Sequence, residues 1–172
     1  MAVGAADAGG KLSFERYVMG EAFREILTEA NIRLQIMTGG KFELIHQVEA
    51  SRANAAAGLD IDVMDHSSET VRKAGSLSGG EGFQVSMALA LGLSDVVQNH
   101  AGGTEIDAMF IDEGFGSLDD GVLGSAVQVL EQLSQGSRQI GIISHVSKLE
   151  ECISKKIIVK GSEQGSKIQI VF

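Results

Sequence analysis

The sequence predicts an α/β fold with a mainly parallel sheet, flanking helices and a C-terminal hairpin. An apolar strand at 106–111, an amphipathic helix capped by Asp119 or Asp120, and an apolar strand at 139–143 follow one another closely. This order and length are typical of a parallel βαβ unit. Two more strands, at 155–160 and 167–171, flank a glycine-containing turn and predict the hairpin.

The N-terminal part of the chain predicts one long helix. Residues 1–12 are rich in Ala and Gly and are predicted to be a flexible tail or a linker. Residues 13–37 form an amphipathic helix, because apolar residues recur at steps of three and four. Gly39 and Gly40 end it. Its apolar positions are Phe14, Val18, Ala22, Phe23, Ile26, Leu27, Ala30, Leu34 and Met37.

Two strands follow this helix. Residues 41–49 and 59–65 alternate apolar and polar side chains, and an Ala/Gly-rich loop around 55–58 joins them. Residues 67–76 are polar and predicted to be irregular. Arg72 and Lys73 lie in this irregular segment, either as a solvated pair or in contact with phosphate.

The stretch Leu77-Ser78-Gly79-Gly80-Glu81 precedes a nearly unbroken apolar segment at 82–99, which predicts a largely buried helix. Ser78 and the two glycines therefore lie at a helix N-terminus. Free backbone N–H groups and the positive end of the helix dipole favour an anion there, and glycine lets it approach the backbone. A serine before two glycines is also an ordinary N-cap.

Polar residues follow both predicted parallel strands. Asp112 and Glu113 end the first strand, and Ser144-His145 follow the second. Ligands of such sheets bind beyond the carboxyl ends of the strands, so these side chains are candidates for one site. The alternatives are a capping or solvated pair for the two acids and a helix-capping role for the histidine.

In this order the pieces resemble the signature motif, Walker B motif, D-loop and switch histidine of ABC-type ATPases. The runs 14–20, 112–119 and 141–146 are similar to the C-terminal ATPase half of the SbcC family, which is related to the structural-maintenance-of-chromosomes (SMC) proteins. The similarity runs from about Phe14 to the end of the chain. The resemblance implies that 13–172 form the C-terminal lobe of an ABC-type ATPase head. Within it lie the helix 13–37 at the base of a coiled coil, the signature motif and helix at 77–99, and the Walker B motif, D-loop and histidine at 106–145.

The resemblance also implies roles for individual residues in binding ATP and Mg²⁺. Asp112 would hold the magnesium ion and Glu113 would orient or deprotonate the attacking water. His145 would bond the terminal phosphate. Ser78, Gly79, Gly80 and Glu81 would contact nucleotide held by a second head, and Asp119 would couple the two sites of that homodimer.

Residues 4–11 have the wrong spacing for a P-loop, and Leu12 stands where a hydroxyl residue should ligate magnesium. The resemblance places the P-loop in an N-terminal half that folds together with this one. We therefore expect the fold to be incomplete, and ATP hydrolysis to require that half. The family role is to gate an SbcD-like nuclease at DNA breaks and hairpins, within an exonuclease/endonuclease complex. The alternatives are a chromosome-structuring or recombination-mediator ATPase without a nuclease partner, and the ATPase of a transporter.

Composition and net charge limit the partners and the location that the chain can have. The net charge of −9 argues against strong electrostatic DNA binding by this chain alone. The single cysteine, Cys152, excludes an internal disulfide, and no apolar run is long enough to span a membrane. These features predict a soluble cytoplasmic protein.

Overall fold

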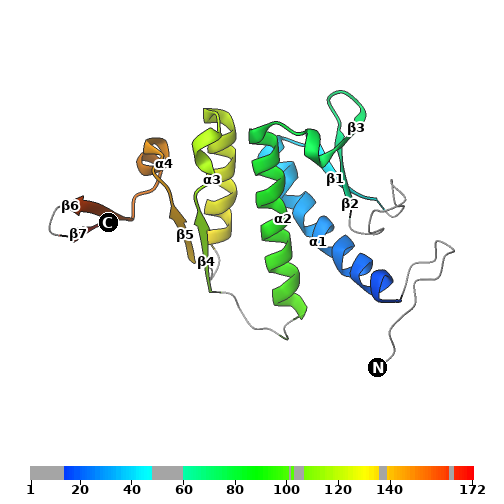
Figure 1. The fold of residues 1–172 in the computed structure, drawn as a ribbon, viewed down its shortest axis with the longest axis horizontal. Helices are drawn as coiled ribbons and strands as arrows, with labels where there is room; N and C mark the ends of the chain where they lie inside the picture. Colours follow the sequence, from blue (N-terminus) through cyan, green and yellow to red (C-terminus); the bar gives the residue numbers. More distant parts are fainter. Residues whose placement is uncertain (1–13, 48–59, 101, 103–106, 136–138, 163–164) are drawn as a thin grey trace.

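The computed structural model describes residues 14–47, 60–100, 102, 107–135, 139–162 and 165–172 (Figure 1). Expectations for the tail, the loop around 55–58, Ile106, Gly136 and the tip of the hairpin fall outside these residues. The helices are α1 Phe14–Thr38, α2 Gly79–His100, α3 Asp120–Ser134 and α4 Ser147–Cys152, with 3₁₀ turns η1 Ala74–Ser76 and η2 Phe115–Ser117. The strands are β1 Phe42–Gln47, β2 Asp60–Asp65, β3 Thr70–Lys73, β4 Ala108–Asp112, β5 Gln139–Ile143, β6 Lys156–Ser162 and β7 Gly165–Val171.

Helix α1 ends as predicted at two glycines. Gly39 and Gly40 have φ values of 61° and 80°, a left-handed conformation that glycine adopts without a Cβ clash. The N–H of Gly40 donates to the carbonyl of Gln35 at 2.9 Å, which satisfies one of the free carbonyls of the last turn. The chain then turns directly into β1.

Helices α1 and α2 lie side by side and supply much of the core (Figure 1). Their backbones approach closely at Gly92 of α2. A Cβ there would lie 2.7 Å from the backbone nitrogen of Ala30 and 2.7 Å from the carbonyl oxygen of Ile26. Since both groups belong to the backbone of α1, a larger residue can fit only if the helices separate.

We expect Gly92→Ala to lower the free energy of unfolding by about 1–3 kcal/mol, because overpacking a tight helix crossing outweighs the better helix propensity of alanine. The matched control is Gly124→Ala on α3, where a Cβ meets nothing within 4 Å. That control is expected to be neutral or stabilising by up to about 1 kcal/mol. Thermal unfolding of the purified variants measures both effects, and equal midpoints for the two would contradict the close crossing.

The segment 67–76, predicted to be irregular, contains strand β3 and turn η1, so that prediction was wrong. β1, β2 and β3 form an antiparallel sheet in that order. Strand β3 is a polar edge strand whose residues are exposed apart from the half-buried Arg72, so it lacks the apolar alternation that marks a strand. Asn31 joins this sheet to α1, because its side-chain amide donates to the carbonyl of Leu44 at 3.0 Å and accepts from the Leu44 N–H at 2.8 Å.

The predicted βαβ unit is confirmed. β4 and β5 pair in parallel, with Met109 beside Ile140 and Ile111 beside Ile142, and α3 connects them. Asp119 is the N-cap of α3, since its Oδ1 accepts from the N–H groups of Gly121 and Val122 at 2.9 and 3.0 Å. The parallel character is confined to this pair, however. The other pairings among the described strands are antiparallel, which corrects the expectation of a mainly parallel sheet.

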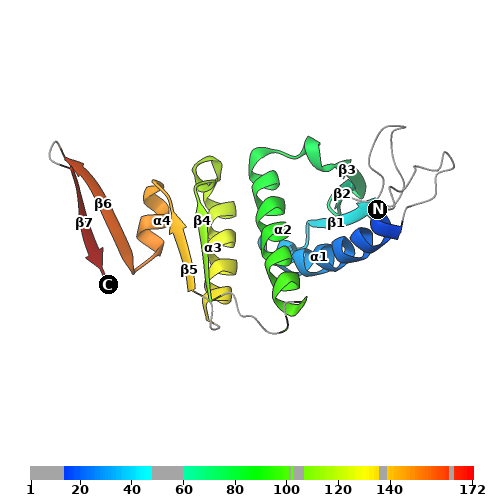
Figure 2. The same ribbon diagram turned by 60° about the horizontal axis from the view of Figure 1, so that its bottom comes forward.

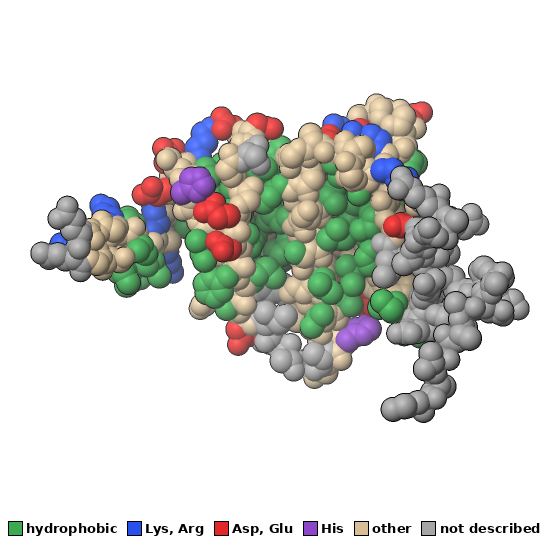
Figure 3. All heavy atoms as spheres, viewed as in Figure 1, with side chains coloured by type: hydrophobic (Ala, Val, Ile, Leu, Met, Phe, Trp, Pro, Cys, Tyr) green, Lys and Arg blue, Asp and Glu red, His purple; other side chains and the backbone are tan. Residues whose placement is uncertain are grey.

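The β6–β7 hairpin is present and projects away from the helices (Figure 2). Strand β6 continues to Ser162 and β7 begins at Gly165, so both strands run past the predicted bounds of 160 and 167. Apolar side chains on one face form the cross-strand pairs Ile157–Ile170 and Val159–Ile168 and are exposed. Figure 3 shows further hydrophobic side chains over the middle of the molecule, across α2, α3 and β4. None of the described helices is long and apolar enough to cross a membrane.

Candidate functional site

The predicted site residues gather at one end of the molecule. Helix α2 begins there, at the top of Figure 1, and strands β4 and β5 both end there because they are parallel. Contacts support this placement, since a Cβ on Gly80 would lie 4.0 Å from Val122 Cγ2 in the first turn of α3. One end of the fold therefore carries a helix N-terminus, two strand ends and a second helix N-terminus.

The turn at the start of α2 is a capping box. The N–H of Ser78 donates to Glu81 Oε2 at 2.9 Å, and the N–H of Glu81 donates to Ser78 Oγ at 3.4 Å. A Cβ on Gly79 would meet nothing within 4 Å, so this turn is open to solvent. The structure thus gives Glu81 a structural function at the helix start, and its predicted contact with nucleotide remains a prediction.

The Ser78 N–H holds the pKa of the Glu81 carboxyl below its ordinary value; burial opposes this, and the Ser78 hydroxyl and Arg72 add to it. A lowered folded-state pKa means that the capping box stabilises the fold above the unfolded pKa. The contribution is lost as pH falls through the folded pKa. Glu81 is therefore charged and holds Ser78 in place at neutral pH.

Strand β4 ends at Asp112, and the chain then reverses through two left-handed residues. Glu113 has a φ of 59° and Gly114 a φ of 96°. The Glu113 N–H donates to the carbonyl of Ile143 at 2.9 Å, which fixes Glu113 beside the end of β5. A left-handed φ is uncommon for glutamate and occurs where the surrounding structure holds it.

This reversal brings the Glu113 carboxylate to His145. Nδ1 of His145 lies 3.1 Å from Glu113 Oε2, and both side chains are largely exposed, 78% for His145 and 51% for Glu113. Sequence reasoning placed both residues at strand ends, and the structure joins them. Gly116 lies on the other side of the His145 ring. If this residue had a side chain, its Cβ would lie 3.9 Å from His145 Nε2, so the glycine leaves that nitrogen accessible.

Asp112 is exposed at the end of β4. In the part of the chain that the structure describes, no group of three or more His, Cys, Asp or Glu residues could hold a metal ion. Magnesium, however, is held in nucleotide sites by one or two carboxylates together with phosphate and water. A single exposed carboxylate at a strand end fits that donor set.

Two aromatic residues that the sequence did not single out connect α2 to this loop. Phe83 in the first turns of α2 packs edge to face on the buried Phe115 of η2, with ring centroids 5.0 Å apart. A Cβ on Gly114 would lie 2.9 Å from the Phe83 ring. The start of α2 and the loop after β4 are therefore packed as one unit. Phenylalanines in an apolar pattern carry no separate sequence signal for this contact.

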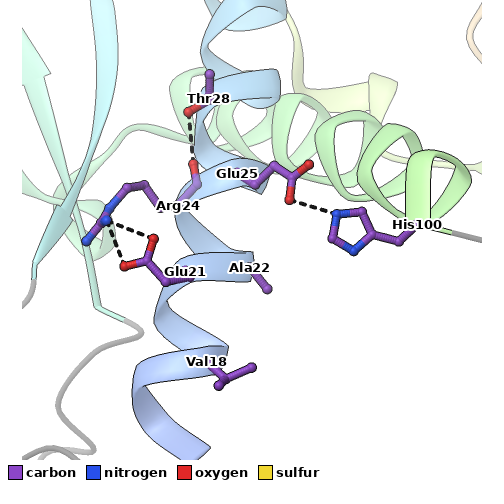
Figure 4. Close-up of a pocket in the computed structure, with 7 residues that line it drawn as sticks. All are labelled: Val18, Glu21, Ala22, Arg24, Glu25, Thr28 and His100. Atoms are coloured by element: carbon purple, nitrogen blue, oxygen red, sulfur yellow. Dashed lines mark hydrogen bonds and ion pairs between the residues drawn. The ribbon is translucent and has the colours of Figure 1, made fainter. Parts of the chain in front are cut away.

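A groove on α1 lies apart from these residues (Figure 4). It is lined by Val18, Glu21, Ala22, Arg24, Glu25, Thr28 and His100. His100 at the C-terminal end of α2 pairs with Glu25 at 2.9 Å, and Arg24 pairs with Glu21. The groove is open, and the charged side chains that line it form ion pairs with one another. It contains none of the predicted site residues.

The fold is that of known ATPase heads. Over 91% of the chain it superposes with a TM-score of 0.70 and 16% identity on a structure reported for "ATP-driven dimerization and DNA stimulated activation of SMC ATPases", of which it covers 89%. It superposes on the Pyrococcus furiosus Smc head bound to the C-terminal domain of ScpA with a TM-score of 0.66 and 17% identity, over 91% of the chain and 37% of that structure. The molecule thus has the fold of an SMC-type ATPase head lobe.

The sequence matches a family model, "SbcC/RAD50-like, Walker B motif", over residues 47–132, half of the chain. The chain belongs to this family. It is 44% identical to the SbcC component of the nuclease SbcCD from Vibrio cholerae over 163 residues, and 49% identical to that of Staphylococcus saprophyticus over 143 residues. These alignments cover 95% and 83% of the chain but only 16% and 14% of the relatives. The chain therefore spans about a sixth of the proteins it matches.

Proposed function

We propose that this chain is the C-terminal half of an SbcC-like ATPase head, and that it hydrolyses ATP together with an N-terminal half and a second head. The observation that carries the proposal is the Glu113–His145 pair at the ends of two parallel strands, with Asp112 beside it. A carboxylate and an imidazole on neighbouring strand ends can accept the proton of an attacking water and stabilise the charge of a phosphate.

Each residue has a distinct role in this proposal. Asp112 holds Mg²⁺, which when bound neutralises charge on the phosphates. Glu113 orients the attacking water and accepts its proton. His145 keeps Nδ1 toward Glu113, so Nε2 is the nitrogen that meets the terminal phosphate. Asp119 fixes the start of α3 as its N-cap and would couple the two sites of the dimer.

The turn Ser78-Gly79-Gly80 supplies the opposite wall of the site. Its backbone N–H groups and the α2 dipole would bind the phosphate of ATP held by the second head. The open space around Gly79 supports this role, because a phosphate can approach the backbone there. Two heads would thus close on two ATP molecules.

Exposed apolar surface supports the need for an N-terminal half. Phe110 on β4 is 73% exposed and Ile143 on β5 is exposed as well, although parallel sheets are normally covered on both faces. Among the described strands, β5 pairs only with β4. The N-terminal half would cover this face and supply the P-loop.

The assembled protein would gate an SbcD-like nuclease that processes DNA breaks and hairpins. The names of the relatives favour this assembly over a chromosome-structuring ATPase without a nuclease. Much of the positive surface for DNA would come from outside this chain, given its net charge of −9. A cytoplasmic location belongs to the same proposal.

Reconstitution tests the proposal. This chain alone is expected to bind ATP negligibly and to show no hydrolysis, because no P-loop lysine holds the phosphates. The N-terminal half alone is expected to bind ATP without turnover, and mixing the halves restores turnover. Phosphate release assays on the two halves and their mixture measure this. Robust turnover by the 172-residue chain alone would contradict the half-site arrangement.

A further inference from the structure

Arg72 on β3 lies between carboxylates from two different elements. Its Nη2 is 3.4 Å from Asp65 Oδ2 at the end of β2 and 3.4 Å from Glu81 Oε1 in the first turn of α2. Only 29% of its side chain is exposed. The guanidinium also lies over the ring of Phe42, 5.4 Å from the centroid. Arg72 is therefore a partly buried bridge between the antiparallel sheet and the signature helix.

The surface that holds Arg72 is well fixed. Phe42 is 2% exposed and stands directly opposite Asp65 in the β1–β2 register. Asp65 is buried and accepts from the Ser67 N–H at 3.0 Å. Lys41 lies over the same Phe42 ring, 4.5 Å from its centroid, and reaches Glu81 Oε1 at 3.6 Å. Two cations thus approach one carboxylate oxygen of Glu81 from the sheet.

The other oxygen of that carboxylate accepts the hydrogen bond from the Ser78 N–H. Glu81 therefore links Arg72 to Ser78. One of its oxygens faces Arg72 and Lys41, and the other caps the turn that would bind phosphate. The same Nη2 lies 3.4 Å from Asp65 Oδ2, so one nitrogen of Arg72 links the Glu81 carboxylate to the end of β2.

We propose that Arg72 is a positioning residue for the phosphate-binding turn, acting through Glu81 on Ser78. This rests on the proposed function and adds a residue to it. A solvated side chain, one of the two alternatives from the sequence, disagrees with the geometry, because Arg72 is partly buried and its Nη2 lies between Asp65 and Glu81. A direct phosphate contact remains a prediction. Lys73, the next residue, instead pairs with Asp62 at 3.3 Å and bonds Gln47.

The test uses the full-length protein and measures the ATP concentration that half-saturates head engagement, beside the affinity of a disengaged head for ATP. Arg72→Ala is expected to raise the half-saturating concentration about three- to ten-fold, the size expected from partly exposed charge pairs. The ATP affinity of the disengaged head stays near wild type. Arg72→Lys, which keeps the charge on a side chain of different shape and reach, gives an intermediate shift. Lys73→Ala is the matched control and behaves as wild type.

A double-mutant cycle tests whether Arg72 acts through Glu81. If Arg72 acts through Glu81, then Arg72→Ala combined with Glu81→Gln shifts engagement no more than the larger single change. Full additivity, or wild-type engagement by Arg72→Ala, overturns the inference. A fall in maximal rate and thermal midpoint with an unchanged half-saturating concentration also overturns it, since that is simple destabilisation. Ser78→Arg is included in the series, and wild-type engagement by that variant would overturn the proposed function itself.

Discussion

Full-length protein carrying Glu113→Gln is expected to bind ATP and hold its heads together while hydrolysing at least about a hundredfold more slowly than wild type. Removing a general base typically costs that much or more. The amide keeps the size of the side chain, and the backbone at φ 59° accepts glutamine as readily as glutamate. Asp112 stays in place, so magnesium is retained and ATP accumulates in the closed dimer.

Light scattering on size-exclusion fractions, with and without ATP and magnesium, measures the closed dimer, and phosphate release measures turnover. Glu131→Gln on the exposed face of α3 is the matched control and should leave both unchanged. Hydrolysis by Glu113→Gln at the wild-type rate would show that Glu113 does not activate the water.

Ser78→Arg is expected to abolish ATP-driven engagement of the heads while ATP still binds the P-loop half. The arginine places a long cation where the backbone turn must close on phosphate of the opposite head. It also removes the serine hydroxyl from the capping box, which costs about 1 kcal/mol on its own. Hydrolysis is lost with engagement.

Two further variants separate these effects. Ser78→Ala removes the capping hydroxyl but leaves the turn open to phosphate. Engagement should therefore be weakened and not abolished. Ser134→Arg makes the same change at the exposed end of α3, where a positive charge suits the helix dipole, and should behave as wild type. Engagement by Ser78→Arg at wild-type ATP concentrations would remove Ser78 from the nucleotide site.

Sequence periodicity predicted the elements that are strongly patterned. The long α1 and the β4–α3–β5 unit follow directly from the spacing of apolar residues. Strand β3 was missed because an edge strand of Thr70, Val71, Arg72 and Lys73 has too little apolar alternation to be recognised. The sheets are less parallel than expected, because an alternating pattern shows that a strand exists but not the direction of its partner.

The site was predictable where it depends on strand ends, and unpredictable where it depends on tertiary contacts. Glu113 and His145 were placed together because parallel strands end at the same edge. The left-handed turn that aims Glu113 at the imidazole has no sequence signature beyond the glycine that follows it. The Phe83–Phe115 contact and the Arg72 bridge join segments distant in the sequence, so only the folded chain reveals them.

The central claim is that Ser78 of one head and Glu113 of another act on the same ATP, although the fold brings both to the same end of one chain. Co-expressing Ser78→Arg and Glu113→Gln variants under different tags, and purifying the mixed dimer, tests this claim directly. One site of that dimer combines an intact Ser78 turn with an intact Glu113. The account predicts that the mixed dimer hydrolyses ATP well above either parent dimer, approaching half the wild-type rate. A mixed dimer no faster than its parents would contradict it and place both residues in the same head's site.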